Sequence, residues 1–462
     1  MTRPPATPPA PDGPQGLLVD LYELTMGESY LAEGLAERPA TFQMSCRRLP
    51  EGWGYLLAAG IEPLLDALEA FSFDAAALAF LETTGLFSPG FLEHLAGFRF
   101  RGEVRSMSEG TMFFADEPLV ELTASLLEGQ LVETAVLNGL NFPSLVAAKA
   151  SRCVDAAAGR GLVDFSLRRS HGPDAGLRVA RGSYLAGFDS TSNVLAGETY
   201  GIPVSGTMAH SYVESFADES AAFAAFTRTY PEGATLLIDT YDTLGGARHA
   251  AAVARELRDR GGRLSGVRLD SGDLLDLSRR VRSLLDESGL PEVAIVASGN
   301  LDEHTIARLV AAGAPIDGFG VGTRLGVAAD APSLDGAYKL VSFDGRPVMK
   351  LSPGKQSLPG SKQVWRRVEE GCFAGDVVAL RGEPGPRGAV PLLEPVMEHG
   401  KRMHTQTLAT ARTRAAAQRS ALGLRHRRLD AEPYPVELSP GLSALGERLA
   451  TEIATPPGAP PR

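Results

Sequence analysis

The pattern of apolar and polar positions is most regular in the middle of the chain. Five short apolar or β-branched segments there each end in a polar cluster: IPVSGTMAHS at Ser211, ATLLIDTYD at Asp242, LSGVRLDSGD at Asp273, VAIVASGN at Asn300 and DGFGVGTR at Arg324. The stretches between them carry apolar residues at helical spacing, as in DLLDLSRRVRSLLDESG. Strands alternating with helices predict βαβ modules, which have parallel strands and right-handed crossovers, as in an α/β barrel.

The polar residues at the ends of these predicted strands are the first candidates for a binding site. Ligands of parallel α/β folds gather at the carboxyl ends of the strands. The sequence places His210, Asp239, Arg268, Asp270, Ser298, Asn300 and Thr323 there. Polar residues often end strands for structural reasons alone. However, all five ends carry a glycine, a charge or a hydroxyl, and this favours an active site.

The two flanks have a different pattern. Residues 16–149 mix helical runs such as LLAAGIEPLLDALEAF with alternating segments, and YKLVSFDGRPVMKL contains the hairpin signal Asp344-Gly345. We expect the flanks to form one α/β sandwich domain, from residues 16–149 and 338–452, with the barrel of residues 150–337 inserted between them. The proline-rich ends, residues 1–15 and 453–462, are predicted to be disordered tails.

Composition narrows the class of protein. A net charge of -11 disfavours a general nucleic-acid binder. Three widely spaced cysteines predict neither a disulfide framework nor a structural zinc site, and they suit a reducing cytoplasm. The sequence predicts neither a signal peptide nor a membrane-spanning helix, because its first residues are proline-rich and no apolar run is long enough. Residues 401–428 carry eight Lys/Arg and no Asp or Glu; a solvated basic helix face is favoured there over a phosphate or nucleic-acid site.

Several residues at the strand ends have chemistry of their own. His210 follows a Gly-Thr pair, and its ring can accept a phosphoryl group or move a proton, although a lone histidine is more often structural. Arg268 and Asp270 lie two residues apart and should face the same side, as a substrate contact or as a plain ion pair. Asp270 and Asp273 are candidate ligands of ribose or Mg²⁺, but Asp273 is favoured as a helix N-cap.

Glycines after the last strand give a weaker signal. Gly318, Gly320 and Gly322 in DGFGVGTRLG are as typical of a tight turn as of a phosphate cradle. Their place at a strand end favours phosphate, because bare backbone N–H groups there can face an anion. His171, in RRSHGPDAG, is interpreted as part of a loop rather than as a second active-site histidine.

Long motifs in this sequence resemble the nicotinate phosphoribosyltransferase family. They are VDLYELTMGESYL, FSLRRSHGPDAG, GFDSTSNVLAGETYGIPVSGTMAHSYV, LIDTYDTLGG, GVRLDSGDL, ASGNLDE, DGFGVGTRL, YKLV and KLSPGKQSLPGSKQVWR. They occur in this order from about Val19 to Arg367. The resemblance implies an irregular α/β barrel of the type II phosphoribosyltransferase kind beside a sandwich domain, and a homodimer with active sites between the subunits.

The resemblance also implies a reaction: nicotinate and phosphoribosyl pyrophosphate give nicotinate mononucleotide and pyrophosphate, with Mg²⁺ and coupled ATP hydrolysis. No zinc, flavin, nucleic acid or membrane is implied. His210 resembles a histidine that ATP phosphorylates, and it is grouped with Arg268 and Asp270 as catalytic, Asp270 also as a Mg²⁺ ligand. The nicotinate contacts would be Tyr22 from the neighbouring subunit, Phe165, Arg168, Asp189 and Ser211. The phosphoribosyl and phosphate contacts would be Thr207, Asp239, Ser298, Gly299, Asn300, Gly320, Gly322 and Thr323.

Three alternatives remain open. Nicotinamide is the rival acceptor within the same chemistry. A lyase that uses a Schiff-base lysine is disfavoured because none of the five strand ends carries a lysine. A phosphoribosyl-binding regulator without catalysis would bind the substrates and release no pyrophosphate.

Overall fold

The computed structural model describes residues 15–352 and 357–454, so the two predicted tails lie outside the described residues except at their inner ends. The described residues cluster into two compact units: a central unit of residues 146–332, and a flank unit built from the chain before and after it. No helix among these residues combines the length and the apolar character that crossing a membrane requires.

The central unit is built on a six-stranded sheet of order β7-β6-β11-β10-β9-β8, in which all pairs are parallel. Its strands are β6 (Gly161–Asp164), β7 (Ser190–Thr191), β8 (Glu232–Leu237), β9 (Arg263–Leu269), β10 (Ala294–Ala297) and β11 (Gly318–Val321). Leu236, Val267, Ile295 and Phe319 are fully buried on neighbouring strands. This curled parallel sheet confirms the predicted barrel-type α/β fold.

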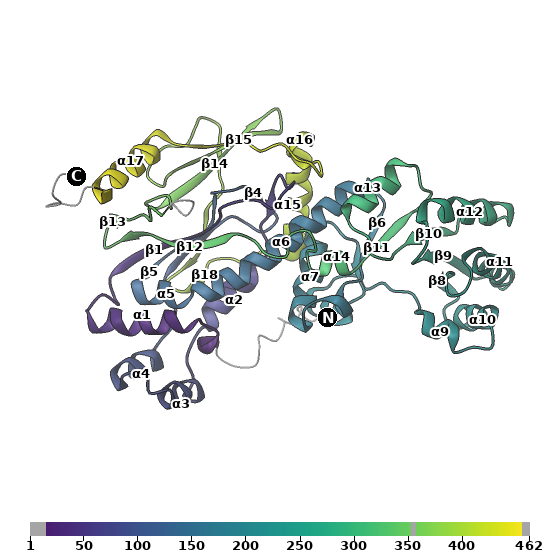
Figure 1. The fold of residues 1–462 in the computed structure, drawn as a ribbon, viewed down its shortest axis with the longest axis horizontal. Helices are drawn as coiled ribbons and strands as arrows, with labels where there is room; N and C mark the ends of the chain where they lie inside the picture. The colour runs from purple at the N-terminus through teal and green to yellow at the C-terminus, as the bar shows by residue number, and fades with distance from the viewer. Residues whose placement is uncertain (1–14, 353–356, 455–462) are drawn as a thin grey trace. The chain divides into compact units, whose positions relative to one another are not determined.

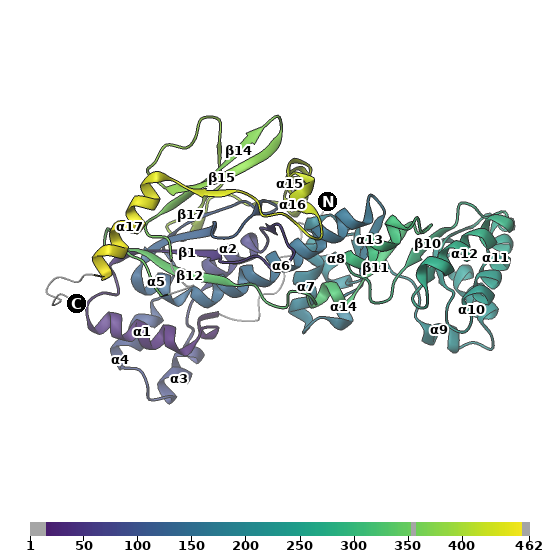
Figure 2. The same ribbon diagram turned by 45° about the horizontal axis from the view of Figure 1, so that its top comes forward.

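Helices cover the strands of the central unit: α10 packs on β8, α11 on β9 and α12 on β10, at the right of Figure 1, and α10, α11 and α12 gather at the same end in Figure 2. They are α7 (Pro173–Ala186), α8 (Val194–Tyr200), α9 (His210–Glu214), α10 (Glu219–Thr229), α11 (Thr243–Asp259), α12 (Leu274–Glu287), α13 (Glu303–Ala311) and α14 (Thr323–Gly326), with a 3-10 turn, η2 (Leu167–Arg169). The four helices predicted between residues 219 and 313 are confirmed. Asp273 caps α12 by accepting from the Leu275 and Asp276 N–H groups at 3.0 and 3.2 Å, as expected.

The prediction of the first of the five strands is wrong. The segment that ends at Ser211 forms only an isolated bridge, between Val204 and Thr191. Pro203 has no N–H to donate to a ladder, and residues 203–206 are exposed, so the segment crosses the sheet edge as a loop. The places in the sheet are taken by β6 and β7, which the strand pattern had not singled out.

The flank unit is mainly antiparallel. A seven-stranded sheet has the order β13-β12-β1-β5-β3-β17-β18, and a four-stranded sheet has the order β16-β14-β15-β19. The strands are β1 (Pro39–Cys46), β2 (Leu56–Leu57), β3 (Glu103–Ser106), β4 (Met112–Phe113), β5 (Pro118–Ser125), β12 (Gly336–Phe343), β13 (Arg346–Pro347), β14 (Lys362–Glu369), β15 (Cys372–Leu380), β16 (Val390–Pro391), β17 (Glu394–Glu398), β18 (Lys401–Arg402) and β19 (Val436–Leu438). Because β1 pairs with β12 across the insertion, both flanks contribute to one sheet.

Helices of the flank unit pack on these sheets. They are η1 (Gln15–Leu17), α1 (Leu21–Ala32), α2 (Ile61–Ala70), α3 (Ala75–Thr83), α4 (Pro89–Ala96), α5 (Leu126–Leu131), α15 (Leu408–Ala421), α16 (Leu424–Arg427) and α17 (Pro440–Ala454), while α6 (Glu133–Ala157) continues into the central unit. The predicted hairpin is confirmed: β12 and β13 are joined by Asp344 and Gly345, with φ of 50° and 76°. Both lie in the left-handed region that a two-residue type I′ turn requires.

Candidate active site

The carboxyl ends of the central strands bring the predicted histidine and arginine into one polar network. His210, the first residue of α9, has its Nδ1 3.2 Å from the Thr240 hydroxyl, which follows β8. Its Nε2 lies 3.9 Å from a carboxylate oxygen of Asp270, after β9. The His210 side chain is 41% exposed, so the ring is held by two neighbours and still open to solvent.

Asp239 and Asp270 connect three successive strand ends. The Asp239 carboxylate accepts from the Asp270 N–H at 2.9 Å and from the Ser271 hydroxyl at 2.6 Å. The Ser298 hydroxyl, after β10, donates to Asp270. One oxygen of Asp239 is buried without a hydrogen-bond partner. A buried acceptor in this condition is a candidate contact for an ion or a substrate.

Arg268 is the buried cation of the site. It is 9% exposed, and its Nη1 donates to the Thr207 hydroxyl, in the loop before α9. Its Nε has no hydrogen-bond partner. Burial lowers the pKa of the guanidinium, Asp270 and Asp239 raise it, and Arg168 lowers it. The Arg168 charge thus acts on Arg268, and an anion bound here would be attracted by both cations.

The turn after β6 places an aromatic ring beside the glycines of β11. A Cβ at position 320 would overlap the ring of Phe165, and a Cβ at 322 would lie 3.3 Å from the Phe165 carbonyl oxygen. Gly320 therefore leaves room for Phe165. The sequence pattern had favoured phosphate binding over a tight turn for this glycine, and the phosphate role stays a prediction. Phe165 is half-buried, so part of its surface remains accessible to a substrate.

The loops after β10 and β11 meet through Asn300. Its backbone has φ of 53°, and its side-chain oxygen accepts from Arg324 Nε at 3.2 Å. Gly299 before it has φ of 94°, and a Cβ there would collide with the Asp270 carbonyl oxygen. Thr323 is the first residue of α14, directly after β11. The Ser298–Asn300 turn is thus fixed against the Asp270 loop and is linked to α14 through Arg324.

Other predicted residues have different surroundings. Asp189 precedes β7, and its carboxylate accepts from the Leu162 N–H at 2.9 Å, so it supports the sheet; a contact with the base stays a prediction. Ser211 is exposed on α9, and His171 is exposed in the loop before α7. Tyr22 belongs to the flank unit, where it is 44% exposed on α1. Burial and the neighbouring Glu133 carboxylate raise the pKa of its phenol.

A separate acidic cluster in the central unit is already neutralised by cations. Glu303, His304 and Asp330 are the one group of possible metal ligands in the described part of the chain. Lys149 Nζ lies 2.8 Å from a Glu303 oxygen and also contacts Asp330, and Arg152 Nε lies 3.1 Å from the second Glu303 oxygen. Because two buried cations bind these carboxylates, the cluster is a structural ion-pair network.

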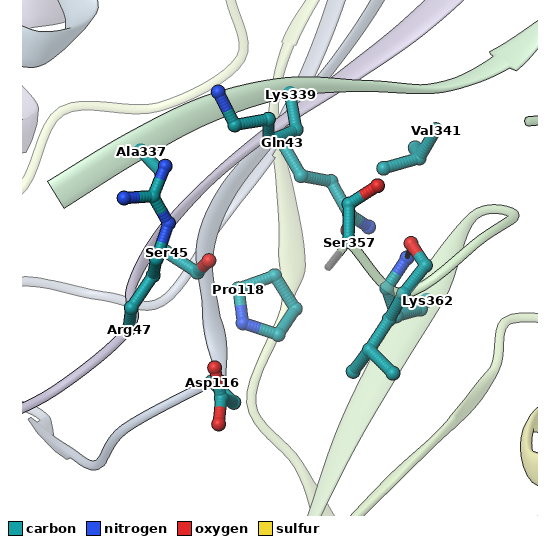
Figure 3. A pocket seen from close by; sticks show the side chains of 11 residues that line it. Gln43, Ser45, Arg47, Asp116, Pro118, Ala337, Lys339, Val341, Ser357 and Lys362 are labelled. Atoms are coloured by element: carbon teal, nitrogen blue, oxygen red, sulfur yellow. Dashed lines mark hydrogen bonds between the residues drawn. The ribbon is translucent and has the colours of Figure 1, made fainter. Parts of the chain in front are cut away.

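The flank unit has a polar hollow of about 40 Å³, lined by basic residues that include Arg47, Lys339 and Lys362 (Figure 3). Burial lowers the pKa of Lys362 to about 7. Its Nζ donates to the Leu358 and Gly360 carbonyls at 2.7 and 2.6 Å, and these acceptors favour the charged amine. The hollow is about the size of a single water and contains none of the predicted site residues.

The basic segment 401–428 is partly used inside the flank unit. Arg402 lies 2.7 Å from Glu62 and 2.6 Å from Asp66 on α2. Arg414 donates to the Glu109 carbonyl at 2.7 Å, and Arg427 to the Leu422 carbonyl at 3.0 Å. These contacts support the interpretation of the segment as a helix surface rather than as an anion site.

Three polar residues near the strand ends were missed by the sequence reasoning. Thr240 contacts His210, and Asp164 and Thr191 bond to each other at the ends of β6 and β7. Thr240 follows Asp239 in LLIDTYD, so its place at a strand end was visible. Asp164 and Thr191 lie on β6 and β7, which come before the repeating pattern of strands and helices.

Comparisons with known proteins agree with this geometry. Family models of the nicotinate phosphoribosyltransferase (NAPRTase) N-terminal domain, the NAPRTase family and the nicotinate phosphoribosyltransferase C-terminal domain match residues 17–141, 161–364 and 385–446. A nicotinate phosphoribosyltransferase of Mycobacterium tuberculosis is 49% identical over 95% of this chain and 93% of its own length. One of Bacillus subtilis is 42% identical over 80% of this chain and 77% of its own.

Solved structures show the same fold. The crystal structure of human nicotinic acid phosphoribosyltransferase has a TM-score of 0.84 and 33% identity, covering 93% of this chain and 99% of the human one. That of a nicotinate-nucleotide pyrophosphorylase from Pyrococcus furiosus has a TM-score of 0.72 and 26% identity, covering 88% and 95%. The chain belongs to the nicotinate phosphoribosyltransferase family.

Proposed function

We propose that this protein transfers the phosphoribosyl group of phosphoribosyl pyrophosphate to nicotinate, giving nicotinate mononucleotide and pyrophosphate in NAD biosynthesis. The observation that carries the proposal is the network at the strand ends, where three pair contacts, Thr207–Arg268, His210–Asp270 and Asp270–Ser298, bring three separate segments of the chain together. Family membership supports the choice of substrates. The three cysteines are unpaired, which supports a reducing cytoplasm as the location.

The geometry fits a reaction that needs positioning and charge stabilisation. The bond from ribose C1 to pyrophosphate breaks while C1 gains oxocarbenium character, and the nicotinate nitrogen then bonds to C1. Arg268 and Arg168 provide positive charge for the leaving pyrophosphate or for the nicotinate carboxylate. Phe165 can lie on one face of the pyridine ring, and the Asp270 carboxylate can bind ribose hydroxyls or stabilise the developing positive charge.

A magnesium ion is expected with the pyrophosphate substrate. Asp270, together with the partnerless oxygen of Asp239, offers the hard oxygen ligands that Mg²⁺ prefers. When bound, the ion would neutralise charge on the leaving group. We propose these two carboxylates as its protein ligands.

ATP hydrolysis is proposed to be coupled through His210. A ring nitrogen lone pair would attack the γ-phosphorus of ATP, the bond to the ADP oxygen would break, and water would later release phosphate from the phosphohistidine. Exposure of the ring and its contact with Thr240, which fixes the ring orientation, support this role. The added negative charge would lie beside Asp270 and Arg268 and would change the affinity for the anionic substrates.

The assembly is proposed to be a homodimer in which Tyr22 of one subunit stacks on the pyridine ring in the other. Tyr22 is exposed, and Leu17, Leu18 and Leu21 beside it are 42%, 50% and 55% exposed. Exposed apolar side chains in a row favour an interface. Mixing Tyr22→Ala and Arg268→Ala subunits tests this directly. Half of the reassembled dimers would be mixed, each with one intact site of two, so about a quarter of wild-type activity should return. No recovery in reassembled dimers would contradict a shared site.

The decisive assay measures pyrophosphate release and mononucleotide formation with Mg²⁺, with and without ATP. We expect product with nicotinate, stimulated by ATP. Acid-labile phosphate should form on the wild type and be absent from His210→Ala. Phosphate retained on that variant would refute the role of His210. Substrate binding without pyrophosphate release would support the regulator instead.

Nicotinamide is the acceptor that must be compared. A cationic pair such as Arg168 and Arg268 favours the carboxylate of nicotinate over a neutral amide. Parallel assays with both bases should show a clear preference for nicotinate. A preference for nicotinamide would overturn the assignment of substrate and leave the reaction type intact.

A further inference from the structure

The turn after β6 carries two of the residues proposed to bind the substrates, Phe165 and Arg168. It begins at Asp164, the last residue of β6, which pairs with Val321 of β11 on one side and with Thr191 of β7 on the other. Asp164 is only 1% exposed, and its side chain lies at the carboxyl end of the strand. A carboxylate this deeply buried needs partners for both oxygens.

Asp164 finds these partners in its own turn and in the neighbouring strand. One oxygen accepts from the Ser166 N–H at 2.9 Å, and the other accepts from the Thr191 hydroxyl at 2.7 Å. Burial raises the pKa of Asp164, while the Ser166 and Thr191 donors lower it. Thr191 Oγ1 in turn accepts from the Asn193 N–H at 3.0 Å. Two strand ends and two loops are therefore joined by one buried carboxylate.

The bond to Ser166 fixes the direction in which the chain leaves the sheet. The Ser166 carbonyl accepts from the Arg169 N–H at 2.8 Å, which closes the 3-10 turn that carries Arg168. Just before Ser166, Phe165 donates its N–H to the Val321 carbonyl at 2.8 Å and lies against Gly320. Asp164 thus holds Ser166, which lies in the chain between Phe165 and Arg168.

We propose that Asp164 and Thr191 are positioning residues for the transfer reaction, holding the turn so that Phe165 and Arg168 face the substrates. This inference rests on the proposed function. Neither residue touches the reacting atoms; both act through the geometry of residues 165–168. A purely structural carboxylate would support folding and leave substrate affinity unchanged, so kinetics and stability together separate the two roles.

Thr191→Val is the sharpest test because it removes one hydroxyl and keeps the side-chain shape. Thr227→Val is the matched control: Thr227 is also buried in the central unit, and its hydroxyl donates to the Phe223 carbonyl of α10 at 2.9 Å. We expect kcat/KM for nicotinate to fall about tenfold in Thr191→Val, mainly through KM, and to change less than about twofold in the control. Thr191→Ser, which restores the hydroxyl, should recover most of the loss.

A second variant tests the carboxylate itself. Asp164→Asn keeps the shape and can still accept from Ser166, but its amide group would face the Thr191 hydroxyl, which must then give up its role as donor to this side chain. We expect a similar rise in KM for nicotinate. In an Arg168→Ala, Phe165→Ala background, Asp164→Asn should have little further effect, because the residues through which it acts are gone.

Hydrogen exchange supplies a readout that does not depend on activity. The Ser166 amide hydrogen should exchange faster in Thr191→Val than in the wild type. In Thr227→Val its exchange rate should be unchanged. Equal thermal destabilisation of the two threonine variants with equal, unchanged KM values would overturn the inference. If the wild type turns over neither base, the proposed function fails. In that case the exchange rate of the Ser166 amide in Thr191→Val is the remaining test of the positioning role. An unchanged rate would reject that role.

Discussion

Two buried arginines, one in each unit, show how differently the two parts of the molecule use charge. Arg366, on β14 of the flank unit, is 1% exposed and lies 2.6 Å from Asp376 on β15. It also donates to Gln418 at 2.8 Å and to the Met112 carbonyl at 2.9 Å. Arg268, on β9 of the central unit, has a hydroxyl partner in Thr207 and a buried Nε with none.

The electrostatic consequence is opposite in the two units. Burial lowers the pKa of Arg366, but the Asp376 carboxylate outweighs it, so the pKa lies above its ordinary value. For Arg268 burial is the largest influence and the pKa lies below its ordinary value. A fully bonded arginine contributes to the fold, whereas an incompletely bonded one retains affinity for an added anion. The difference marks the central unit as the binding unit.

The largest expected effect is on the stability of the flank unit. Arg366→Ala leaves Asp376 buried without its cation and should lower the free energy of unfolding by about 3–5 kcal/mol. Urea denaturation measures this. Arg367→Ala is the control, since Arg367 is 34% exposed and pairs with an exposed Glu437, and it should cost less than about 1 kcal/mol. Equal losses would break the comparison.

The central arginine should show the reverse behaviour. Arg268→Ala is expected to lower kcat/KM about 10²–10³-fold, because the charge of the leaving group loses its buried partner. Its thermal midpoint should stay near that of the wild type. Arg263→Ala, at the exposed opposite end of the same strand, should leave both values unchanged. A strongly destabilised Arg268→Ala would show that this arginine is structural after all.

Glu23 on α1 is an exception inside the flank unit. It is fully buried, Thr134 donates to one oxygen, and the other oxygen has no partner. Burial raises its pKa from 4.5 to about 7. The contribution of Glu23 to the free energy of unfolding is therefore at its maximum below pH 4.5, and it is lost as the pH rises through about 7.

Replacing this carboxyl should remove that pH dependence. The shift in the Glu23 pKa corresponds to about 3 kcal/mol of unfolding free energy at high pH. Above pH 8, Glu23→Gln should therefore be more stable than the wild type by up to about 3 kcal/mol. Chemical denaturation at pH 5 and pH 9 measures it. If the free energy of unfolding depends on pH in the same way in the wild type and in Glu23→Gln, the Glu23 carboxyl is not protonated in the folded protein as we expect.

The smallest effect concerns Gly320. Gly320→Ala would force the Phe165 ring away from β11, and KM for nicotinate should rise about tenfold. Gly446→Ala, where a Cβ meets open space on α17, should leave the kinetics unchanged and stabilise the helix by about 1 kcal/mol. Unchanged kinetics for both variants would show that the position of Phe165 does not matter.

Regular elements of the central unit were predictable where the repeating pattern was long enough. The helices between residues 219 and 313 and the strands β8 to β11 followed from the apolar spacing, and Asp273 was recognised as a cap from its place before α12. The strand predicted before His210 was wrong. Its apolar residues resemble a strand, but the segment forms only one isolated bridge with the sheet. β7 has only two residues, and β6, although as long as β10, lies before the repeating pattern begins.

The alternation of strands and helices, the polar strand ends and the resemblance to a family were all predictable from the sequence, because they depend on local spacing and on long motifs. The hydrogen-bond partners of the polar groups became visible only in the folded chain. It showed Arg268 incompletely bonded, Asp189 committed to a backbone N–H and Gly320 making room for Phe165. Such partnerships join residues far apart in the chain, and spacing along the sequence carries no information about the distances between them.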